Sequence, residues 1–244
     1  MKVARFGLLY QAIWMQALGN NRIRQILAEA EEGNLFTARI GETEAFRFHP
    51  LFREFLLLRL EIEVGAEAMK QLRISFAEAY VKSDHNKDAI DQFLAAGESA
   101  RAVKLIEAEG KGLLHSGEYN ILRDWLDRLG KDHVSAALNI LDARLLIENG
   151  KPREALVILA RTKKDLRKKD VNFAFDCIRA YAECLKELSK FDEAIDELIR
   201  LLEMKLDTDN RLEALYILGI NYCMHQKDKG IEECLKLAGE IIAS

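Results

Sequence analysis

The sequence predicts an all-α protein in which paired helices form a right-handed α-α superhelix, preceded by a small N-terminal domain with one β-hairpin. Three observations predict this fold. Proline occurs only 2 times in 244 residues, while Ala, Leu, Glu and Lys, which favour helices, are abundant. Apolar residues recur with helical spacing along most of the chain. Small residues recur at a fixed spacing across successive turns, which indicates a structural repeat.

The composition excludes several classes of protein. Hydrophobic residues make up 49% of the chain and charged residues 31%, as expected for a folded globular protein. The net charge of −4 and the lack of a clustered basic surface predict no direct nucleic acid binding. No uncharged apolar run is long enough to span a membrane, and the first residues lack a signal-peptide cleavage site. We therefore expect a cytoplasmic protein that does not contact a membrane.

No pattern in the sequence points to catalysis or to a bound metal. Cys177 and Cys184 lie too far apart along one predicted helix to form a disulfide, and no cysteine has zinc-site spacing. His49 is a candidate catalytic base, but only Glu44 and Glu54 are candidate partners, so a role at a hairpin–helix junction is favoured. We expect no enzyme activity, no cofactor and no metal site. Free, mostly buried thiols are expected at Cys177, Cys184, Cys223 and Cys234.

The N-terminal part of the chain begins with a predicted helix and a hairpin. Residues 21–32 carry apolar side chains at i, i+3, i+4 and i+7, which is the pattern of a helix with one buried face, and Gly33 is placed to end it. Two short stretches rich in aromatic and β-branched residues follow, at 35–40 and 45–48, around the sequence GETE. They predict a β-hairpin.

A second predicted helix starts at Pro50, where a missing N–H costs nothing. An apolar stripe runs along this helix, at Leu51, Phe55, Leu58 and Ile62, and is widened by Phe52 and Leu56. The order helix, hairpin, helix fits the second half of a winged-helix domain, with the hairpin as the wing. Residues 1–65 are therefore expected to form a partial winged-helix domain, with its hairpin at about 35–48.

Residues 66–244 are predicted to form helical pairs. Small residues lie twelve positions apart across the turns, one in the middle of a first helix and one early in the next, where they allow close helix approach. These pairs are Ala77/Ala89, Ala143/Ala155 and Ala182/Ala194, with Gly219/Ile231 as a degraded fourth. The pattern is that of the tetratricopeptide (TPR) hairpin. Repeat spacings of 39 and 37 residues exceed the roughly 34 of the standard repeat, so the region is TPR-like, and residues 98–130 form another pair in a looser register.

Residues 34–60, NLFTARIGETEAFRFHPLFREFLLLRL, resemble the wing and final helix that precede the superhelix in MalT-like regulators. These regulators are large LuxR-type signal-transduction ATPases. Residues 88–107, 117–129 and 146–161 are similar to the repeats of the same family. The matching positions in the first stretch are Asn34, Leu35, Phe36, Phe46, Arg47, Phe48, His49, Leu51, Phe52, Phe55, Leu56, Arg59 and Leu60.

The resemblance implies a sensory module. In the family, the superhelix binds an inducer or partner protein, with an oligosaccharide as the inducer in one member, and signals to an ATPase domain. This chain has no Gly-x-x-x-x-Gly-Lys-Ser/Thr motif, and its last residues, LKLAGEIIAS, offer no basic recognition helix. ATPase and DNA-binding domains are therefore expected to be absent from this chain, which would be the middle portion of such a regulator. A stand-alone TPR-like scaffold that joins proteins stays open, and the reading frame upstream of Met1 would separate the two.

The candidate binding site is the inner, concave face of the predicted superhelix. Charged groups and a tyrosine in a groove can orient a peptide, a partner protein or a small polyol. The alternative interpretation is that these are ordinary solvated helix positions. The first-helix positions expected to point inward are Arg144, Asp176, Arg179, Glu183 and Tyr216.

Overall fold

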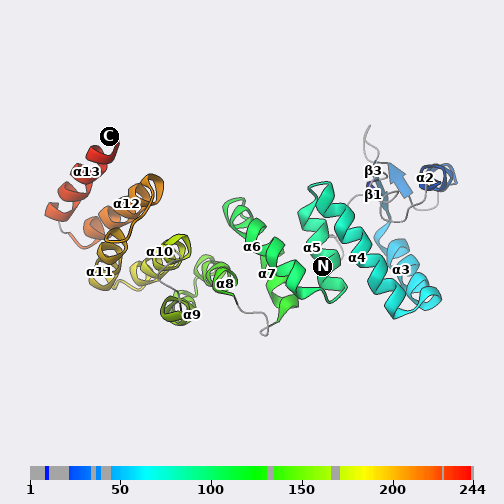
Figure 1. Cartoon of the computed structure of the whole chain (residues 1–244), viewed down its shortest axis with the longest axis horizontal. Coiled ribbons are helices and arrows are strands. Elements are labelled where there is room, and N and C mark those ends of the chain that lie inside the picture. The colour runs from blue at the N-terminus through cyan, green and yellow to red at the C-terminus, as the bar shows by residue number, and fades with distance from the viewer. Residues whose placement is uncertain are drawn as a thin grey trace. The chain divides into compact units, whose positions relative to one another are not determined.

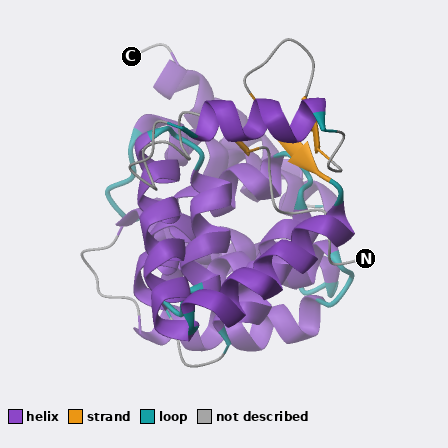
Figure 2. Cartoon of the chain, turned by 90° about the vertical axis from the view of Figure 1, so that its right-hand side faces the viewer, coloured by secondary structure: helices purple, strands orange, loops and turns teal. Residues whose placement is uncertain are grey.

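The fold is known from a computed structural model that describes residues 9–10, 22–33, 37–39, 45–130, 135–165, 171–226 and 228–242. Helices make up nearly all of these residues (Figures 1 and 2). The chain divides into two compact units. The division falls within the two helices that Figure 1 labels α6 and α7. Unit 1 is Met1–Glu109 with Asp127–His133, and unit 2 is Gly110–Leu126 with Val134–Ser244.

Unit 1 contains a small antiparallel sheet of order β1-β3-β2. Strand β2 (Thr37–Arg39) pairs with β3 (Ala45–Phe48), with Thr37 opposite Phe48 and Arg39 opposite Phe46. The predicted hairpin is therefore confirmed. Strand β1 (Leu9–Tyr10) pairs with the other edge of β3 and was not predicted, because two residues give no readable alternation.

The two predicted helices of the N-terminal part are confirmed as α2 (Ile23–Glu32) and α3 (Pro50–Val64). Gly33 is the C-cap of α2, and its N–H donates to Glu29 O. His49 is the N-cap residue of α3 and is exposed, but its side chain makes no capping hydrogen bond. It therefore lies at the hairpin–helix junction, as predicted, without capping the helix.

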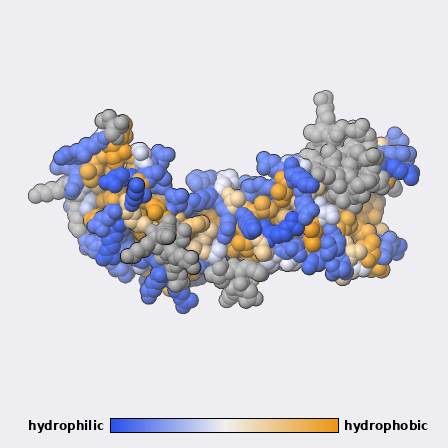
Figure 3. Space-filling model, in the orientation of Figure 1, coloured by the Kyte–Doolittle hydropathy of each residue, from blue (hydrophilic) through white to orange (hydrophobic). Residues whose placement is uncertain are grey.

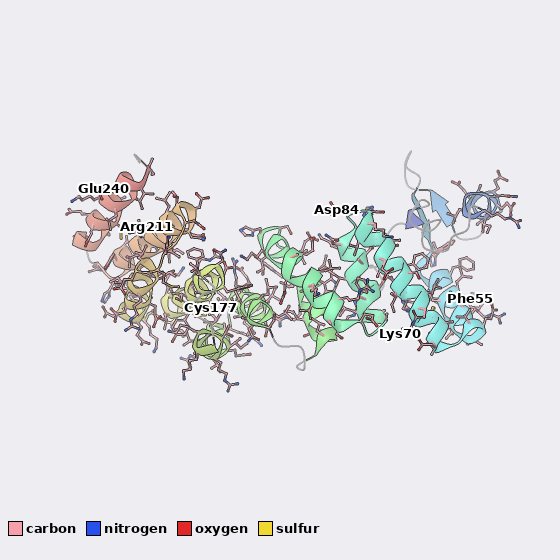
Figure 4. The ribbon with its side chains drawn as sticks, in the orientation of Figure 1. Phe55, Lys70, Asp84, Cys177, Arg211 and Glu240 are labelled. Atoms are coloured by element: carbon pink, nitrogen blue, oxygen red, sulfur yellow. The ribbon has the colours of Figure 1, made fainter. Side chains whose placement is uncertain are left out.

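The apolar stripe of α3 lies on the surface. Leu51, Phe55, Leu58 and Ile62 are between 55% and 71% exposed, and Figure 3 shows hydrophobic surface in this part of unit 1, where Figure 4 labels Phe55. Phe52, which widens the stripe, is half-buried and contacts the Phe48 ring edge-on at 5.9 Å. The helical period was thus predicted correctly, but periodicity does not say which face of a helix is covered.

Ten further helices form five consecutive pairs, as predicted. In four of these pairs the two helices pack against each other: α4 with α5, α8 with α9, α10 with α11 and α12 with α13. The pairs are α4 (Ala66–Lys82) with α5 (Asn86–Ala95), α6 (Ser99–His115) with α7 (Tyr119–Leu129), α8 (Ala136–Glu148) with α9 (Pro152–Asp165), α10 (Val171–Glu187) with α11 (Phe191–Leu202), and α12 (Thr208–Met224) with α13 (Asp228–Ile242).

The alanines of the predicted register are fully buried in the helix pairs. All six are 0% exposed: Ala77, Ala89, Ala143, Ala155, Ala182 and Ala194. In the fourth pair, a Cβ placed on Gly219 would lie 3.9 Å from Cys234 Cβ, while Ile231 is only half-buried. The degraded pair therefore packs through a different residue of α13 than the one predicted.

The turns between the helices reveal that α6 and α7 share this register. One residue in the turn of every pair has a left-handed backbone, with φ between 54° and 72°. Counting back seven residues from each gives the small residue of the first helix, which in α6 is Gly110. A Cβ on Gly110 would overlap the Leu141 side chain, so any larger residue there would require that side chain to shift. The left-handed residues are Asp84, Gly117, Gly150, Ser189 and Gln226.

Each unit has its own buried side chains. In unit 2, an apolar cluster that includes Leu185, Leu198, Leu218 and Cys234 joins α10, α11, α12 and α13, and another joins α8, α9 and α10. In unit 1, Arg128 Nη1 donates to the buried Asp91 Oδ1 at 2.6 Å and ties the end of α7 to α5. None of the helices described is both long and apolar enough to cross a membrane.

The expected domain boundary after residue 65 stays a prediction. Gly65, with φ of 79°, separates α3 from α4 at this point, so the chain does change direction there. Unit 1 includes both the N-terminal part and the first helical pair.

Candidate functional site

A row of charged side chains lies on the first helices of unit 2. Residues three, four or seven positions apart share one helix face, which brings Asp176, Arg179 and Glu183 together on α10. Packing of α10 against both α8 and α12 extends the row to the neighbouring first helices. We call this set the first-helix row: Lys111, Arg144, Glu148, Asp176, Arg179, Glu183, Glu213 and Tyr216.

Asp176 is the most buried member of the row, at 9% exposed. Lys111 Nζ, from the unit 2 part of α6, lies 2.6 Å from Asp176 Oδ2. A carboxylate in such surroundings needs a hydrogen-bonded cation, because removing an unpaired charge from water costs several kcal/mol or more. The ion pair therefore holds the Asp176 carboxylate in place on α10. A carboxylate at an ordinary solvated position would not need such a partner.

Arg179 joins α10 to α12. Its Nη1 donates to Glu213 Oε1 at 2.7 Å. Its Nε is buried and has no hydrogen-bond partner. A guanidinium holds its donors in a rigid fork, so pairing with Glu213 leaves the remaining donor fixed in place. Arg179 thus carries an unsatisfied donor that is shielded from solvent.

Arg144 lies next to this network on α8. Burial lowers its pKa, Arg179 lowers it further, and the carboxylates of Glu183, Asp176 and Glu148 raise it. The group stays protonated at neutral pH, because an arginine pKa begins so far above 7. Among the residues described, its side chain donates no hydrogen bond, so Arg144 is a second cation with free donors.

The structure brings together four of the five predicted site residues, Arg144 and the three on α10. Tyr216 lies on α12, one turn beyond Glu213, and is 70% exposed. It lies beside the cluster, on the adjoining helix. Whether the five bind a ligand stays a prediction.

Three members of the row were missed by sequence reasoning. Glu148 and Glu213 each lie one helical turn from a predicted residue, so face periodicity was a usable signal. Lys111 could not be found this way, because it belongs to α6 and reaches Asp176 only through tertiary packing.

Two clefts of unit 2 lie away from the predicted residues. The larger has a volume of about 880 Å³, and the ion pair of Arg123 Nη1 with Asp142 Oδ1 at 2.8 Å is part of its lining. Its lining is Arg123, Asp142, Leu146, Asn149, Lys151, Glu154, Val157 and Ile158. The smaller, of about 290 Å³, lies between α11, α12 and α13.

No arrangement typical of catalysis or metal binding is found in the described part of the chain. No group of three or more His, Cys, Asp or Glu side chains could hold a metal ion there. His85, His115 and His225 lie at helix ends, and His133 lies outside the described residues. All four cysteines are free, and Cys223 alone among them is exposed.

The buried thiols are expected to be unreactive. Burial raises the pKa of Cys177 to about 11 and that of Cys184 to about 12, so both remain protonated well above neutral pH. Because the thiolate is the reacting form, we expect Ellman's reagent at about pH 8 to modify Cys223 rapidly and the three buried thiols only after unfolding. Cys223→Ser should remove the rapid phase, whereas a rapid phase that survives this substitution would contradict the prediction.

Comparisons with known proteins show what each part of the chain is similar to. Residues 3–68 match the MalT winged helix domain. The solved structure of YrrB, titled a TPR protein with an unusual peptide-binding site, is similar with a TM-score of 0.53 and 19% identity. The match covers 76% of this chain and 91% of that chain, and at this identity it shows the fold alone. Winged-helix and TPR-like regions are non-catalytic modules. The chain therefore carries a MalT-type winged-helix domain at its N-terminus, followed by a TPR-like helical region.

Proposed function

We propose that this chain is a non-enzymatic sensory or interaction module of a MalT-like signal-transduction transcriptional regulator. Its TPR-like region would bind an inducer or a partner protein. The observation that carries the proposal is the first-helix row, which lies on the helical region that follows a MalT-type winged helix in the same chain. In this proposal the helices form a right-handed α-α superhelix with the row on its inner face.

The chemistry of the row supports a polar ligand. Asp176 and Glu213 are already neutralised by their partners, while Arg144 keeps its donors for carbonyl, hydroxyl or carboxylate oxygens. Tyr216 offers an exposed ring that can stack on a peptide or a sugar. A peptide of a partner protein or an oligosaccharide inducer would both satisfy these groups. That YrrB is titled a peptide-binding TPR protein supports the peptide.

The alternative function is a stand-alone TPR-like scaffold. It is favoured by the extent of the fold likeness, since the TPR structure covers 76% of this chain. An in-frame P-loop domain encoded upstream of Met1 would support the regulator, and a promoter at that position would support the scaffold.

Tyr216→Ala is the most informative single substitution for testing the binding proposal. The residue is 70% exposed, so its truncation should leave the fold intact. We expect calorimetric titration with maltodextrins and with peptides selected from a random library to identify at least one ligand. Its affinity should fall about tenfold in Tyr216→Ala, because an exposed aromatic anchor is lost.

Leu235→Ala is the matched control, because Leu235 is 68% exposed but lies on the second helix α13. It should bind the same ligand with an affinity within about twofold of the unsubstituted chain. Equal losses in the two variants would reject the row as the binding face, and the absence of any ligand from both panels would reject the binding function.

A further inference from the structure

A second surface of unit 2, distinct from the first-helix row, is the smaller cleft. We call it the C-terminal cleft. Its lining comes from α11, α12 and α13 and is mostly aliphatic. Figure 3 shows hydrophobic atoms edged by hydrophilic ones over these helices. The lining residues are Ile199, Leu202, Glu203, Leu215, Leu218, Tyr222, Gly230, Glu233, Cys234 and Leu237.

Buried side chains of α12 form the floor of this cleft. Leu215 and Leu218 are almost fully buried beneath it. A Cβ on Gly230 would lie 2.6 Å from the Tyr222 ring, so the absent side chain lets α13 start directly against that ring. At about 290 Å³, the cleft is at the lower limit of ligand sites, which are about 300–1,000 Å³. It has room for aliphatic side chains rather than for a large cofactor.

The rim of the cleft is acidic. Its only charged lining residues are Glu203 and Glu233, both exposed. Neither carboxylate has a hydrogen bond or an ion pair within the described parts of the chain. Glu203 is also the C-cap of α11, where the helix dipole adds partial negative charge. Across residues 191–244, acidic side chains outnumber basic ones two to one.

We propose that the C-terminal cleft binds an amphipathic, cationic segment of a partner protein. An aliphatic side chain of that segment would enter the cleft, and Lys or Arg residues beside it would pair with Glu203 and Glu233. Charge complementarity selects this occupant. A second copy of this chain would bring an equally acidic region to the same place, and like charges opposite one another oppose such a contact.

The test uses a fluorescent helical peptide of about 15 residues, made of Leu on one face and Lys on the other, and its counterpart with Glu in place of Lys. Anisotropy measured with the whole chain at physiological salt should show the Lys peptide binding at least about tenfold more tightly than the Glu peptide. Glu233→Lys should weaken binding of the Lys peptide about tenfold.

Glu232→Lys is the matched control. It makes the same change of charge on the same helix, but its side chain points about 100° away from that of Glu233 and does not line the cleft. Its effect should stay within about twofold. If the two substitutions weakened binding equally, the peptide would be held by non-specific charge attraction, and the proposal would be overturned. Equal binding of the two peptides would overturn it as well.

Two further measurements distinguish the proposed occupant of the C-terminal cleft from the alternatives. Ile199→Gln changes the apolar wall without changing charge and should weaken the Lys peptide, whereas Ile242→Gln, at an exposed position outside the lining, should not. Self-association of the unsubstituted chain in sedimentation, abolished by Glu233→Lys, would assign the cleft to a second copy and overturn the proposal. Tyr216→Ala should leave peptide binding here unchanged, so this proposal and the proposed function fail separately.

Discussion

Trp125→Ala is expected to destabilise unit 2 by about 3–5 kcal/mol, the range for removing a fully buried aromatic side chain. Trp125 is 0% exposed and is among the largest fully buried side chains, in a region of α6 and α7 that also buries Leu113 and Leu122. Alanine would leave a cavity that rigid neighbouring helices cannot close. The free energy of unfolding, measured by circular dichroism in urea, should fall by this amount.

Trp125→Phe keeps most of the apolar volume and should lose distinctly less than the alanine variant. Tyr216→Ala, which truncates an exposed ring, should change the free energy of unfolding by no more than about 0.5 kcal/mol. If Trp125→Ala and Tyr216→Ala shifted the urea transition equally, the packing described for α7 would be wrong.

Ala182→Leu should destabilise the chain by about 3 kcal/mol, the upper part of the range for overpacking. Ala182 is 0% exposed and belongs to the cluster in which α10 meets α11 at Ala194. Three extra carbon atoms buried between two packed helices must push them apart or force a strained rotamer. Thermal unfolding should show a clearly lowered midpoint.

Ala108→Leu is the control for the size change, because Ala108 is an exposed position on α6. Both substitutions keep a residue with good helix propensity, so only the tertiary contact differs. A lowered midpoint in both variants would mean that leucine itself, rather than crowding at the register position, causes the loss.

Much of the helical repeat could be read from the sequence, because its physical cause is local. Small residues at Ala143 and Ala182 recur where two antiparallel helices must approach, and both are fully buried. The equivalent residue of α6, Gly110, escaped because its partner in the next helix is the bulky Leu122 instead of a small residue. Only the left-handed turn residue, Gly117, shows that this pair follows the same register.

Tertiary packing sets the limit of what the sequence could predict. The stripe of α3 was recognised, but its exposure depends on what covers it, which a period of 3.6 residues does not encode. The partners of the site are likewise non-local, since Lys111 meets Asp176 across helices and Glu213 meets Arg179. The C-terminal cleft also needed the structure, because its lining comes from three helices.

The fold now explains why binding, rather than chemistry, is the function to test. A MalT-type winged helix at residues 3–68 and a TPR-like region are both non-catalytic modules. The larger cleft has an ion pair, Arg123 with Asp142, in its wall, and its remaining polar groups lie in the α8–α9 turn and the first turn of α9. The first-helix row is the surface on which charges are both fixed in place and incompletely satisfied.

Hydrogen–deuterium exchange with and without the tightest ligand of the maltodextrin and peptide panels tests the central claim most directly. Binding at the first-helix row predicts slower exchange in α8, α10 and α12, over residues 136–148, 171–187 and 208–224. The second helices α9, α11 and α13 should change little. Protection confined to those second helices, or to the winged-helix part, would contradict the assignment of the row as the binding face.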